Sequence, residues 1–341
     1  MSGEDKPLVS IVVPTRNCEK TIELLLKSLS KVKGNFEVII VDASTDRTPE
    51  IVRRYPFAKL IKVEHKGINW SRNIGVKVSR GDIVAFTDGD CIVPENWIER
   101  ILKAFNRGKY ACVGGNVYVA PQLRGNIIAE YADNALIPLH PIYDREKVIS
   151  VDNFYSEFHL RRCPPGNNMA FRKEVLLKIG LFDERFWIGY DDVDIMWRLC
   201  LNGYRIYCDP AIVVYHLHRS RLLDLLKQAY RYGKGHYVFY SKHKNSPFSK
   251  ITHIMLSGSL GFLCLMITLG AMTLAGLLNK IILPIFLLSV YLVHALLYRV
   301  WRKVSVVKCL LYPIIDFMVY SSYVIGFLKQ MVCCKIGKGR L

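Results

Sequence analysis

A run of 29 residues without one Asp, Glu, Lys or Arg, 251–279, constrains this chain more than any other feature of its sequence. The run exceeds the ~20 apolar residues with which a helix crosses the hydrocarbon core of a membrane. A second uncharged stretch, 281–298, follows almost at once. Together they predict two membrane-spanning helices, 251–278 and 281–298, joined by a turn at Asn279 and Lys280.

A third apolar segment, 304–328, is harder to place because Lys308, Pro313 and Asp316 interrupt it. Ionisable side chains are costly inside a bilayer, so the segment could span the membrane, re-enter it or lie in its interface. If it spanned, the basic residues after it would lie opposite the other basic clusters, against the positive-inside rule. We therefore favour an interfacial or re-entrant helix.

The excess of positive charge, 47 Lys and Arg against 29 Asp and Glu, collects beside these stretches. Residues 219–250 carry eight basic side chains and one acidic one, and Arg299, Arg302 and Lys303 follow the second stretch. This pattern predicts a basic amphipathic helix on an anionic membrane surface over 218–250. The alternative is a nucleic-acid-binding protein, but no zinc module, RNA-binding signature or basic heptad region occurs. We expect membrane lipids and no nucleic acid as partners.

The preceding part of the chain, 1–217, alternates short apolar runs with segments of helical spacing. In chain order these cover residues 9–14, 19–29, 36–42, 46–55, 60–63, 71–79 and 83–88. Such alternation predicts an α/β domain whose mainly parallel sheet is covered by helices on both faces. Because residues 1–8 are polar, we expect no secretory signal there and a cytoplasmic position for this domain. The basic helix and a membrane region, 251–341, complete three predicted regions.

Polar clusters follow the predicted strands at the edge where such sheets bind ligands. One cluster covers 14–17, a second 42–46, and a third is Asp88-Gly89-Asp90. Two carboxylates held by a turn suit a hard divalent cation that bridges phosphate oxygens, and a solvated turn is the alternative. The sequence has neither a GxGxxG after its first strand nor a P-loop, which argues against dinucleotide oxidoreductases and P-loop NTPases.

A second acidic cluster, Asp191, Asp192 and Asp194, opens a predicted helix. Acids in a first turn complement the helix dipole. Three of them after an aromatic loop that contains Trp187 are more than capping requires, which favours a general base here.

Six motifs in this order resemble those of the family 2 inverting glycosyltransferases of the GT-A fold. They are SIVVPTRN at 10–17, IIVDASTDRT at 39–48, WSRNIG at 70–75, TDGD at 87–90, GNNMAFR at 166–172 and GYDDVD at 189–194. The resemblance covers about residues 8–240. It implies a Rossmann-like, mixed and mainly parallel sheet and an enzyme that uses a UDP- or GDP-type sugar donor.

The resemblance also implies roles for single residues. On the donor side these are Pro14, Asn17, Asp42, Arg72 and Asp88. Asp90 would hold Mg²⁺ or Mn²⁺, and His216 is a candidate second ligand. Asp192 matches the second acid of the family's Glu-Asp pair, whereas Asp191 replaces the usual Glu, so either acid remains a candidate for the base.

The acceptor side is implied less specifically. Gly166, Asn167 and Asn168 resemble an acceptor loop, although a plain turn before a strand is the alternative, and Trp187 stands beside the acidic cluster. Gln228 and Arg231 belong to QAYRY, which departs from the QxxRW motif of processive synthases at its last position. An amphipathic helix without a role in chemistry is the alternative there.

Together these features imply a multi-pass membrane glycosyltransferase of glycan or polysaccharide biosynthesis with a cytoplasmic catalytic domain. A lipid-linked glycan or a polyprenyl phosphate is the expected acceptor, because anchoring keeps the enzyme at the surface of its substrate. A processive synthase and a catalytically silent scaffold of the same fold remain alternatives. A transporter would need more spans than the sequence offers.

Overall fold

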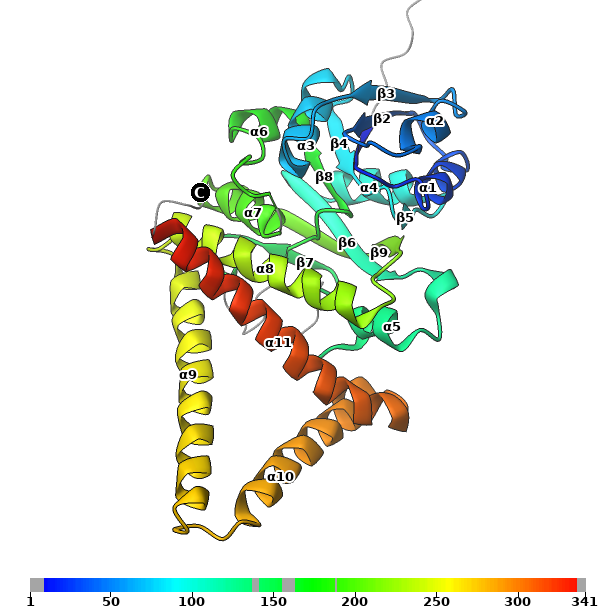
Figure 1. Cartoon of the computed structure of the whole chain (residues 1–341). Coiled ribbons are helices and arrows are strands. Elements are labelled where there is room, and N and C mark those ends of the chain that lie inside the picture. Colours follow the sequence, from blue (N-terminus) through cyan, green and yellow to red (C-terminus); the bar gives the residue numbers. More distant parts are fainter. Residues whose placement is uncertain (1–8, 137–140, 155–162, 188, 336–341) are drawn as a thin grey trace, which may run out of the picture.

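A computed structural model describes residues 9–136, 141–154, 163–187 and 189–335. Figure 1 shows an α/β domain, a helix that lies along its base, and three long apolar helices beyond it. Residues 1–8, where we expect no secretory signal, lie outside the described residues.

The first half of the α/β domain confirms the alternation predicted from the sequence. Its elements are β1 (Val9–Thr15), α1 (Ile22–Leu29), β2 (Phe36–Asp42), α2 (Thr48–Val52), β3 (Ala58–Lys62), α3 (Ile68–Val78) and β4 (Ile83–Phe86). The four strands pair in parallel in the order β3-β2-β1-β4. All of β1 and β4 is buried, as expected of continuous apolar strands with helices on both faces.

Helix α2 is shorter than the predicted helix over 46–55, since it ends at Val52 and begins only after Asp46. The Asp46 Oδ1 accepts hydrogen bonds from the Thr48 backbone N–H at 3.0 Å and from the Thr48 hydroxyl at 2.6 Å. A side chain that bonds the backbone two residues ahead favours a turn before the helix begins. The helix then starts at Thr48 with Pro49 in its first turn.

The second half of the domain adds antiparallel strands. Its elements are β5 (Cys91–Ile92), α4 (Trp97–Asn106), β6 (Cys112–Val119), η1 (Pro121–Leu123), α5 (Ile127–Asn134), β7 (Lys147–Ile149), β8 (Met169–Arg172), α6 (Lys173–Lys178), α7 (Asp191–Leu201) and β9 (Ile206–His216). The sheet order is β3-β2-β1-β4-β8-β6-β9-β5, and β7 also pairs with β9. Because β8 runs antiparallel to both β4 and β6, the sheet is mixed, as the motifs implied.

Beyond β9 the chain is helical. The elements are α8 (Leu222–Lys242), α9 (Pro247–Leu274), α10 (Ile282–Leu297), a π-helical turn η2 (Tyr298–Arg302) and α11 (Val306–Lys335). Helix α9 begins and ends four residues before the predicted span 251–278, because Pro247 occupies its first turn and Gly276, with φ +73°, lies in the turn after it. Helices α9, α10 with η2, and α11 are long and apolar enough to cross a membrane.

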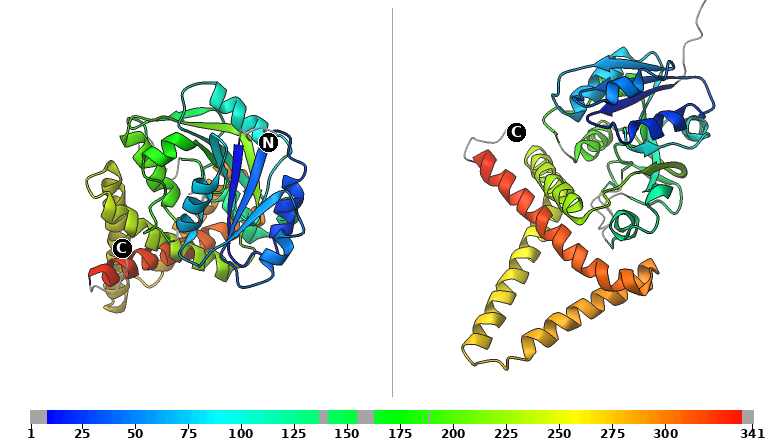
Figure 2. Two further views of the ribbon diagram at one scale, coloured as in Figure 1. Left: turned by 90° about the horizontal axis from the view of Figure 1, so that it is seen from above. Right: turned by 45° about the vertical axis from the view of Figure 1, so that its right-hand side comes forward.

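The three apolar helices form a triangle. In Figures 1 and 2, α9 and α10 meet far from the α/β domain, and α11 runs back along its base beside α8. Along α9 only Phe248 and Thr252 are buried, and along α10 only Ala295. Their apolar side chains therefore face outward, as lipid-facing helices require.

Helix α11 differs from the other two because it packs on the domain. Its Gly326 faces the backbone of α8, where an added Cβ would overlap the carbonyl oxygen of Tyr230. Gly233 of α8 meets the carbonyl oxygen of Tyr323 in the same way. Two glycines thus let the helix backbones touch.

The charged residues that interrupt the third apolar segment have partners in the structure. Lys308 pairs with Glu130 of α5 at 2.5 Å. Asp316 accepts a hydrogen bond from Tyr298 at 2.7 Å, pairs with His294 at 2.9 Å and contacts the hydroxyl of Tyr131. These groups tie α11, and the end of α10, to the α/β domain.

Candidate active site

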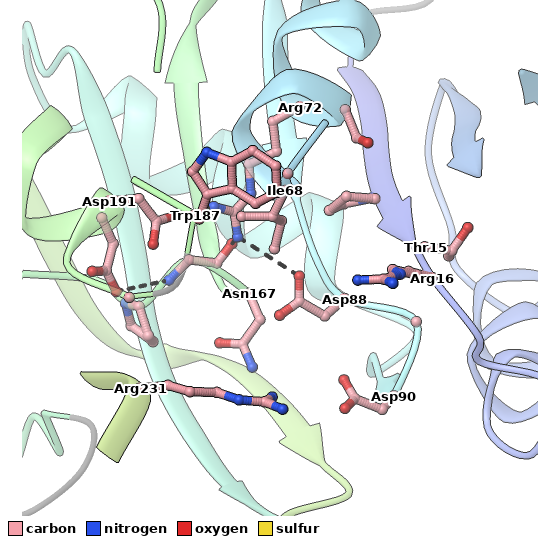
Figure 3. A pocket seen from close by; sticks show the side chains of 18 of the residues that line it. Thr15, Arg16, Ile68, Arg72, Asp88, Asp90, Asn167, Trp187, Asp191 and Arg231 are labelled. Atoms are coloured by element: carbon pink, nitrogen blue, oxygen red, sulfur yellow. Dashed lines mark hydrogen bonds and ion pairs between the residues drawn. The ribbon is translucent and has the colours of Figure 1, made fainter. Parts of the chain in front are cut away.

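A cavity of about 580 Å³ opens at the carboxyl ends of β1 and β4, between the sheet and α8. Residues that line it come from the loop after β1, from α3, from the Asp88–Asp90 turn, from the loop before β8 and from the start of α7. Figure 3 shows Asp88, Asp90, Asn167 and Arg231 around one space. The predicted edge of the sheet is therefore where the polar clusters meet.

Arg72 lies at the centre of the charged groups. Its side chain is 3% exposed and contacts the carboxylate of Asp191, and it lies 3.8 Å from Asp88 Oδ1. The guanidinium also donates to Asn69 Oδ1 at 3.2 Å and to the Gly166 carbonyl at 3.4 Å. The buried Arg72 is therefore compensated by the buried carboxylate of Asp191 and the half-buried one of Asp88, and a buried charge requires such partners.

The two adjacent acids at the start of α7 have different surroundings. Asp191 is buried and engaged by Arg72. Asp192 is half-buried, lines the cavity, and accepts backbone hydrogen bonds from Gly166 at 3.3 Å and Val193 at 2.9 Å. Both acids therefore line the cavity, and they differ in that Arg72 engages the carboxylate of Asp191 whereas backbone N–H groups donate to the carboxylate of Asp192.

Asp90 and His216 form the candidate metal site. Asp90 Oδ1 lies 3.1 Å from His216 Nε2, and ligand atoms of Asp90, Cys91 and His216 lie within 4.8 Å of one another. Burial and the nearby carboxylates raise the pKa of Cys91 well above its ordinary value, so its thiol stays protonated and is a poor ligand. The carboxylate and the imidazole are therefore the fitting donors, with Asp88 at the other end of the turn.

The pKa values of the two carboxylates in this turn are shifted in opposite directions. Burial raises the pKa of Asp88 to about 6, although Arg72 acts to lower it. Burial also acts to raise the pKa of Asp90, but the charge and the hydrogen bond of His216 hold that pKa below its usual range.

The Asp88 Oδ1 and Asn167 Oδ1 atoms are buried without a hydrogen-bond partner among the described residues. Both residues line the cavity, where a bound ligand could satisfy them.

Three of the predicted site residues do not line the cavity. Asp42 accepts hydrogen bonds from Thr15 at 2.8 Å and Ser44 at 2.5 Å, and Asn17 accepts one from the Thr45 backbone at 2.9 Å. Both side chains connect the loops after β1 and β2.

Asn168 is the third. Its side chain donates to the Asn116 and Ile212 carbonyls at 2.8 and 3.0 Å and accepts from the Trp97 ring at 3.0 Å. Asn17, Asp42 and Asn168 thus hold loops and strands near the cavity, and their implied ligand contacts stay predictions.

Helix α8 supplies one wall of the cavity through Gln228, Arg231 and Tyr232. Gln228 donates to the Tyr232 hydroxyl at 3.0 Å, and the Tyr232 ring packs against Gly189 so closely that a Cβ there would lie 2.7 Å from Tyr232 Cδ1. Tyr232, at the motif position where Trp is usual, therefore still packs on the loop that precedes Asp191 and Asp192. Trp187 lines the cavity from that same loop and is 40% exposed.

The cavity residues that the sequence did not indicate include three basic side chains, Arg16, His65 and Arg219. Arg16 stands in the first motif and pairs with His65 at 2.5 Å. Arg219 directly follows His218, and a basic residue next to two candidate ligand histidines is a sequence signal that could have indicated it. His65 has no comparable sequence signal, because only the fold brings the loop after β3 to Arg16.

Residues 10–180, half of the chain, match the family model described as glycosyl transferase family 2. The chain therefore belongs to this family, and it is a glycosyltransferase of glycan biosynthesis with the GT-A fold that its motifs predicted.

Two curated relatives are similar at moderate identity. Glycosyltransferase AglE of Haloferax volcanii is 28% identical over 238 residues, which cover 67% of this chain and 73% of that protein. The pre-mycofactocin glycosyltransferase of Mycobacterium tuberculosis is 28% identical over 239 residues, which cover 68% of this chain and 47% of that protein. This chain thus matches about half the length of the second relative.

Solved structures share the fold at low identity. Mannosyltransferase PcManGT from Pyrobaculum calidifontis, in complex with GDP-Man and Mn²⁺, has a TM-score of 0.64 at 21% identity. That likeness covers 96% of this chain and 87% of the solved one. S. aureus TarS in complex with UDP has a TM-score of 0.50 at 17% identity, covering 96% and 91%.

Proposed function

We propose that the protein is an inverting glycosyltransferase that moves a sugar from a nucleoside diphosphate donor to the hydroxyl of a lipid-linked glycan at the cytoplasmic face of a membrane. The observation that carries this proposal is the difference between the two acids that line the cavity: Arg72 engages the carboxylate of Asp191, while the backbone N–H groups of Gly166 and Val193 donate to the carboxylate of Asp192. A carboxylate held at the cavity opposite a donor site suits one direct displacement.

The donor site is supported by the charges around the cavity. Arg16, Arg219 and Arg231 all line it, and a diphosphate needs such cations. Mg²⁺ or Mn²⁺, held by Asp90 and His216, would supply a further positive charge for the leaving diphosphate when bound. The solved neighbours in complex with GDP-Man and UDP support a nucleotide sugar as donor.

In the reaction, the acceptor hydroxyl attacks the anomeric carbon from the side opposite the diphosphate. The bond between that carbon and the diphosphate oxygen breaks, and the diphosphate leaves with the electron pair. Asp192 takes the proton of the hydroxyl, and Gly166 and Val193, through their backbone N–H groups, hold its carboxylate in place. One displacement inverts the configuration of the sugar.

A polyprenyl phosphate is the second candidate acceptor, and Arg231 on α8 favours it because this cation points into the cavity from the membrane side of the domain. A phosphate acceptor is already ionised at neutral pH and needs no base. The position of Asp192 therefore supports the hydroxyl acceptor more strongly.

The membrane placement rests on the helical triangle. We propose that α9 and α10 cross the bilayer as a hairpin and that α11 lies in the cytoplasmic interface beneath the α/β domain. The pairs Lys308–Glu130 and Asp316–Tyr298 support this placement, because they tie α11 to a soluble element and to the end of α10. An interfacial α11 also keeps the basic residues at its end on the cytoplasmic side.

The proposed activity is tested with the full chain in lipid vesicles. UDP- and GDP-sugars are screened for binding by thermal shift with Mn²⁺, with Mg²⁺ and with chelator, and each binder is then assayed for transfer to lipid-linked glycans. The linkage formed is read by NMR. An inverted anomeric centre is the expected result, whereas a retained centre, or no stabilisation by any sugar nucleotide, would overturn the proposal.

A further inference from the structure

Tyr190, the residue immediately before Asp191 and Asp192, has an unusual backbone. It caps the N-terminus of α7 with φ +65° and ψ +2°, in the left-handed region. A residue with a Cβ adopts this conformation at a cost and keeps it only where its surroundings hold it. What holds Tyr190 therefore also sets the direction in which α7 begins, and with it the position of Asp192.

The groups that hold Tyr190 come from three other helices. Its ring is stacked on the His236 ring of α8, with centroids 4.9 Å apart and an interplanar angle of 5°. Its hydroxyl contacts the hydroxyl of Tyr323 of α11. Tyr323 in turn bonds His236 Nδ1 at 2.8 Å, and His236 Nε2 bonds Thr252 Oγ1 of α9 at 2.9 Å.

The direction of these hydrogen bonds can be worked out for a neutral imidazole. Thr252 uses its single proton to donate to the Phe248 carbonyl at 3.1 Å, so it accepts from His236 Nε2–H. His236 Nδ1 then carries a lone pair and accepts from the Tyr323 hydroxyl, which accepts from Tyr190. The result is one chain from Tyr190 to the backbone of α9.

Most of this chain is buried, although Tyr323 is half-buried. His236 is 0% exposed and Tyr190 2% exposed, and the rings of Phe239 and Phe248 lie 5.8 and 6.2 Å from the Tyr190 ring. Buried hydrogen bonds in series are stronger and stiffer than solvated ones. The contacts therefore fix the relative positions of α7, α8, α9 and α11 at one point.

We propose that Tyr190, Tyr323, His236 and Thr252 form a positioning relay through which the apolar helices α9 and α11 hold Asp192 in its catalytic position. The inference rests on the proposed function, since it assumes that Asp192 is the base. Tyr190 itself lines the cavity, whereas Tyr323, His236 and Thr252 stand behind it and act through Tyr190. Transfer then depends on how α9 and α11 pack, whereas donor binding, which the Asp88–Asp90 turn carries, does not.

The test compares two tyrosines on one face of α11. Tyr323→Phe removes the hydroxyl that contacts Tyr190. The matched control, Tyr320→Phe, removes a hydroxyl that bonds Ser259 at 2.7 Å and the Met255 carbonyl at 3.3 Å, both on α9, without reaching α7. Each variant is made in the full chain in lipid vesicles, and kcat and the donor KM are measured together with the melting temperature.

We expect Tyr323→Phe to lower kcat by about tenfold with an unchanged donor KM, because small misplacements of catalytic groups cost this much or more. Tyr320→Phe should keep the wild-type kcat. Tyr190→Phe should match Tyr323→Phe, and the double variant should be no slower than either single one, since all three break the same link. A wild-type kcat for Tyr323→Phe, an equal loss in Tyr320→Phe, or additive losses would each overturn the relay.

Failure of the relay is distinguishable from failure of the proposed function. If Asp192→Asn transfers sugar at the wild-type rate, Asp192 is not the base and the proposed mechanism fails. If Asp192→Asn is inactive while Tyr323→Phe keeps the wild-type kcat, the mechanism stands and only the relay is overturned.

Discussion

Arg72 and Asp191 form a buried ion pair across 119 residues of sequence, from the middle of α3 to the first turn of α7. The pair gives two neighbouring acids different surroundings. Arg72 engages the carboxylate of Asp191 and lies 3.8 Å from Asp88 Oδ1, whereas the carboxylate of Asp192 accepts hydrogen bonds from the backbone of Gly166 and Val193. The family's usual Glu is therefore replaced at the acid that Arg72 engages.

Asp192→Asn is expected to lower transfer by ~10²–10⁴-fold, the usual range for the loss of a general base. Nucleotide affinity should stay at the wild-type value, because Asp192 acts on the acceptor. Turnover and the calorimetric Kd for the nucleoside diphosphate are measured on one preparation. Parallel loss of affinity and turnover would place Asp192 on the donor side instead.

Asp191→Asn is expected to act on stability. Removing one partner of a buried ion pair typically costs about 3–5 kcal/mol, because the other charge is left buried. The melting temperature of Asp191→Asn should therefore fall well below that of Asp192→Asn, which leaves the pair with Arg72 in place. Equal melting temperatures would mean that Arg72 does not depend on Asp191.

Asp90→Ala and His216→Ala are expected to abolish the gain in nucleotide affinity that Mn²⁺ brings. Cys91→Ser is the matched control, because it changes the third member of the same cluster and leaves the carboxylate and imidazole in place. Calorimetry with and without Mn²⁺ reads the result. Retention of the metal-dependent gain in both alanine variants would exclude this cluster as the cation site.

Gly326→Ala is expected to destabilise the chain by about 1–3 kcal/mol, the usual cost of forcing an extra methyl into a packed contact. The new Cβ would overlap the Tyr230 carbonyl of α8, which is backbone and cannot rotate away. Gly258→Ala on α9 is the control, since an added Cβ there meets nothing within 4 Å. Thermal unfolding that is the same for both variants would contradict the close crossing of α8 and α11.

The topology is tested by labelling single cysteines on intact cells in a background without the native cysteines. Lys280→Cys, in the exposed turn between α9 and α10, should react with an impermeant maleimide. Lys329→Cys, exposed on α11, should react only after permeabilisation. Reaction of Lys329→Cys on intact cells would show that α11 crosses the membrane.

The sequence by itself determined the class of fold and the family. Continuous apolar runs such as 36–42 can be satisfied only inside a covered sheet, and the order of the six motifs is specific to one family, so both were predicted before any contact was known. The uncharged stretches also predicted the apolar helices, because the length and hydropathy of a segment depend on that segment alone and not on its contacts.

Only the tertiary structure decided how the site is divided among its residues. Asp191 and Asp192 are adjacent and chemically identical, and the distant Arg72 distinguishes them. Asp42 and Asn168 belong to family motifs, yet their side chains form hydrogen bonds with neighbouring strands. From the sequence, the helix that carries Tyr323 was only a third apolar segment. The contact of Tyr323 with Tyr190 depends on Gly233 and Gly326, which let α8 and α11 touch. Such relationships join side chains that are far apart in the chain, and the sequence pattern around each residue does not specify its distant partner.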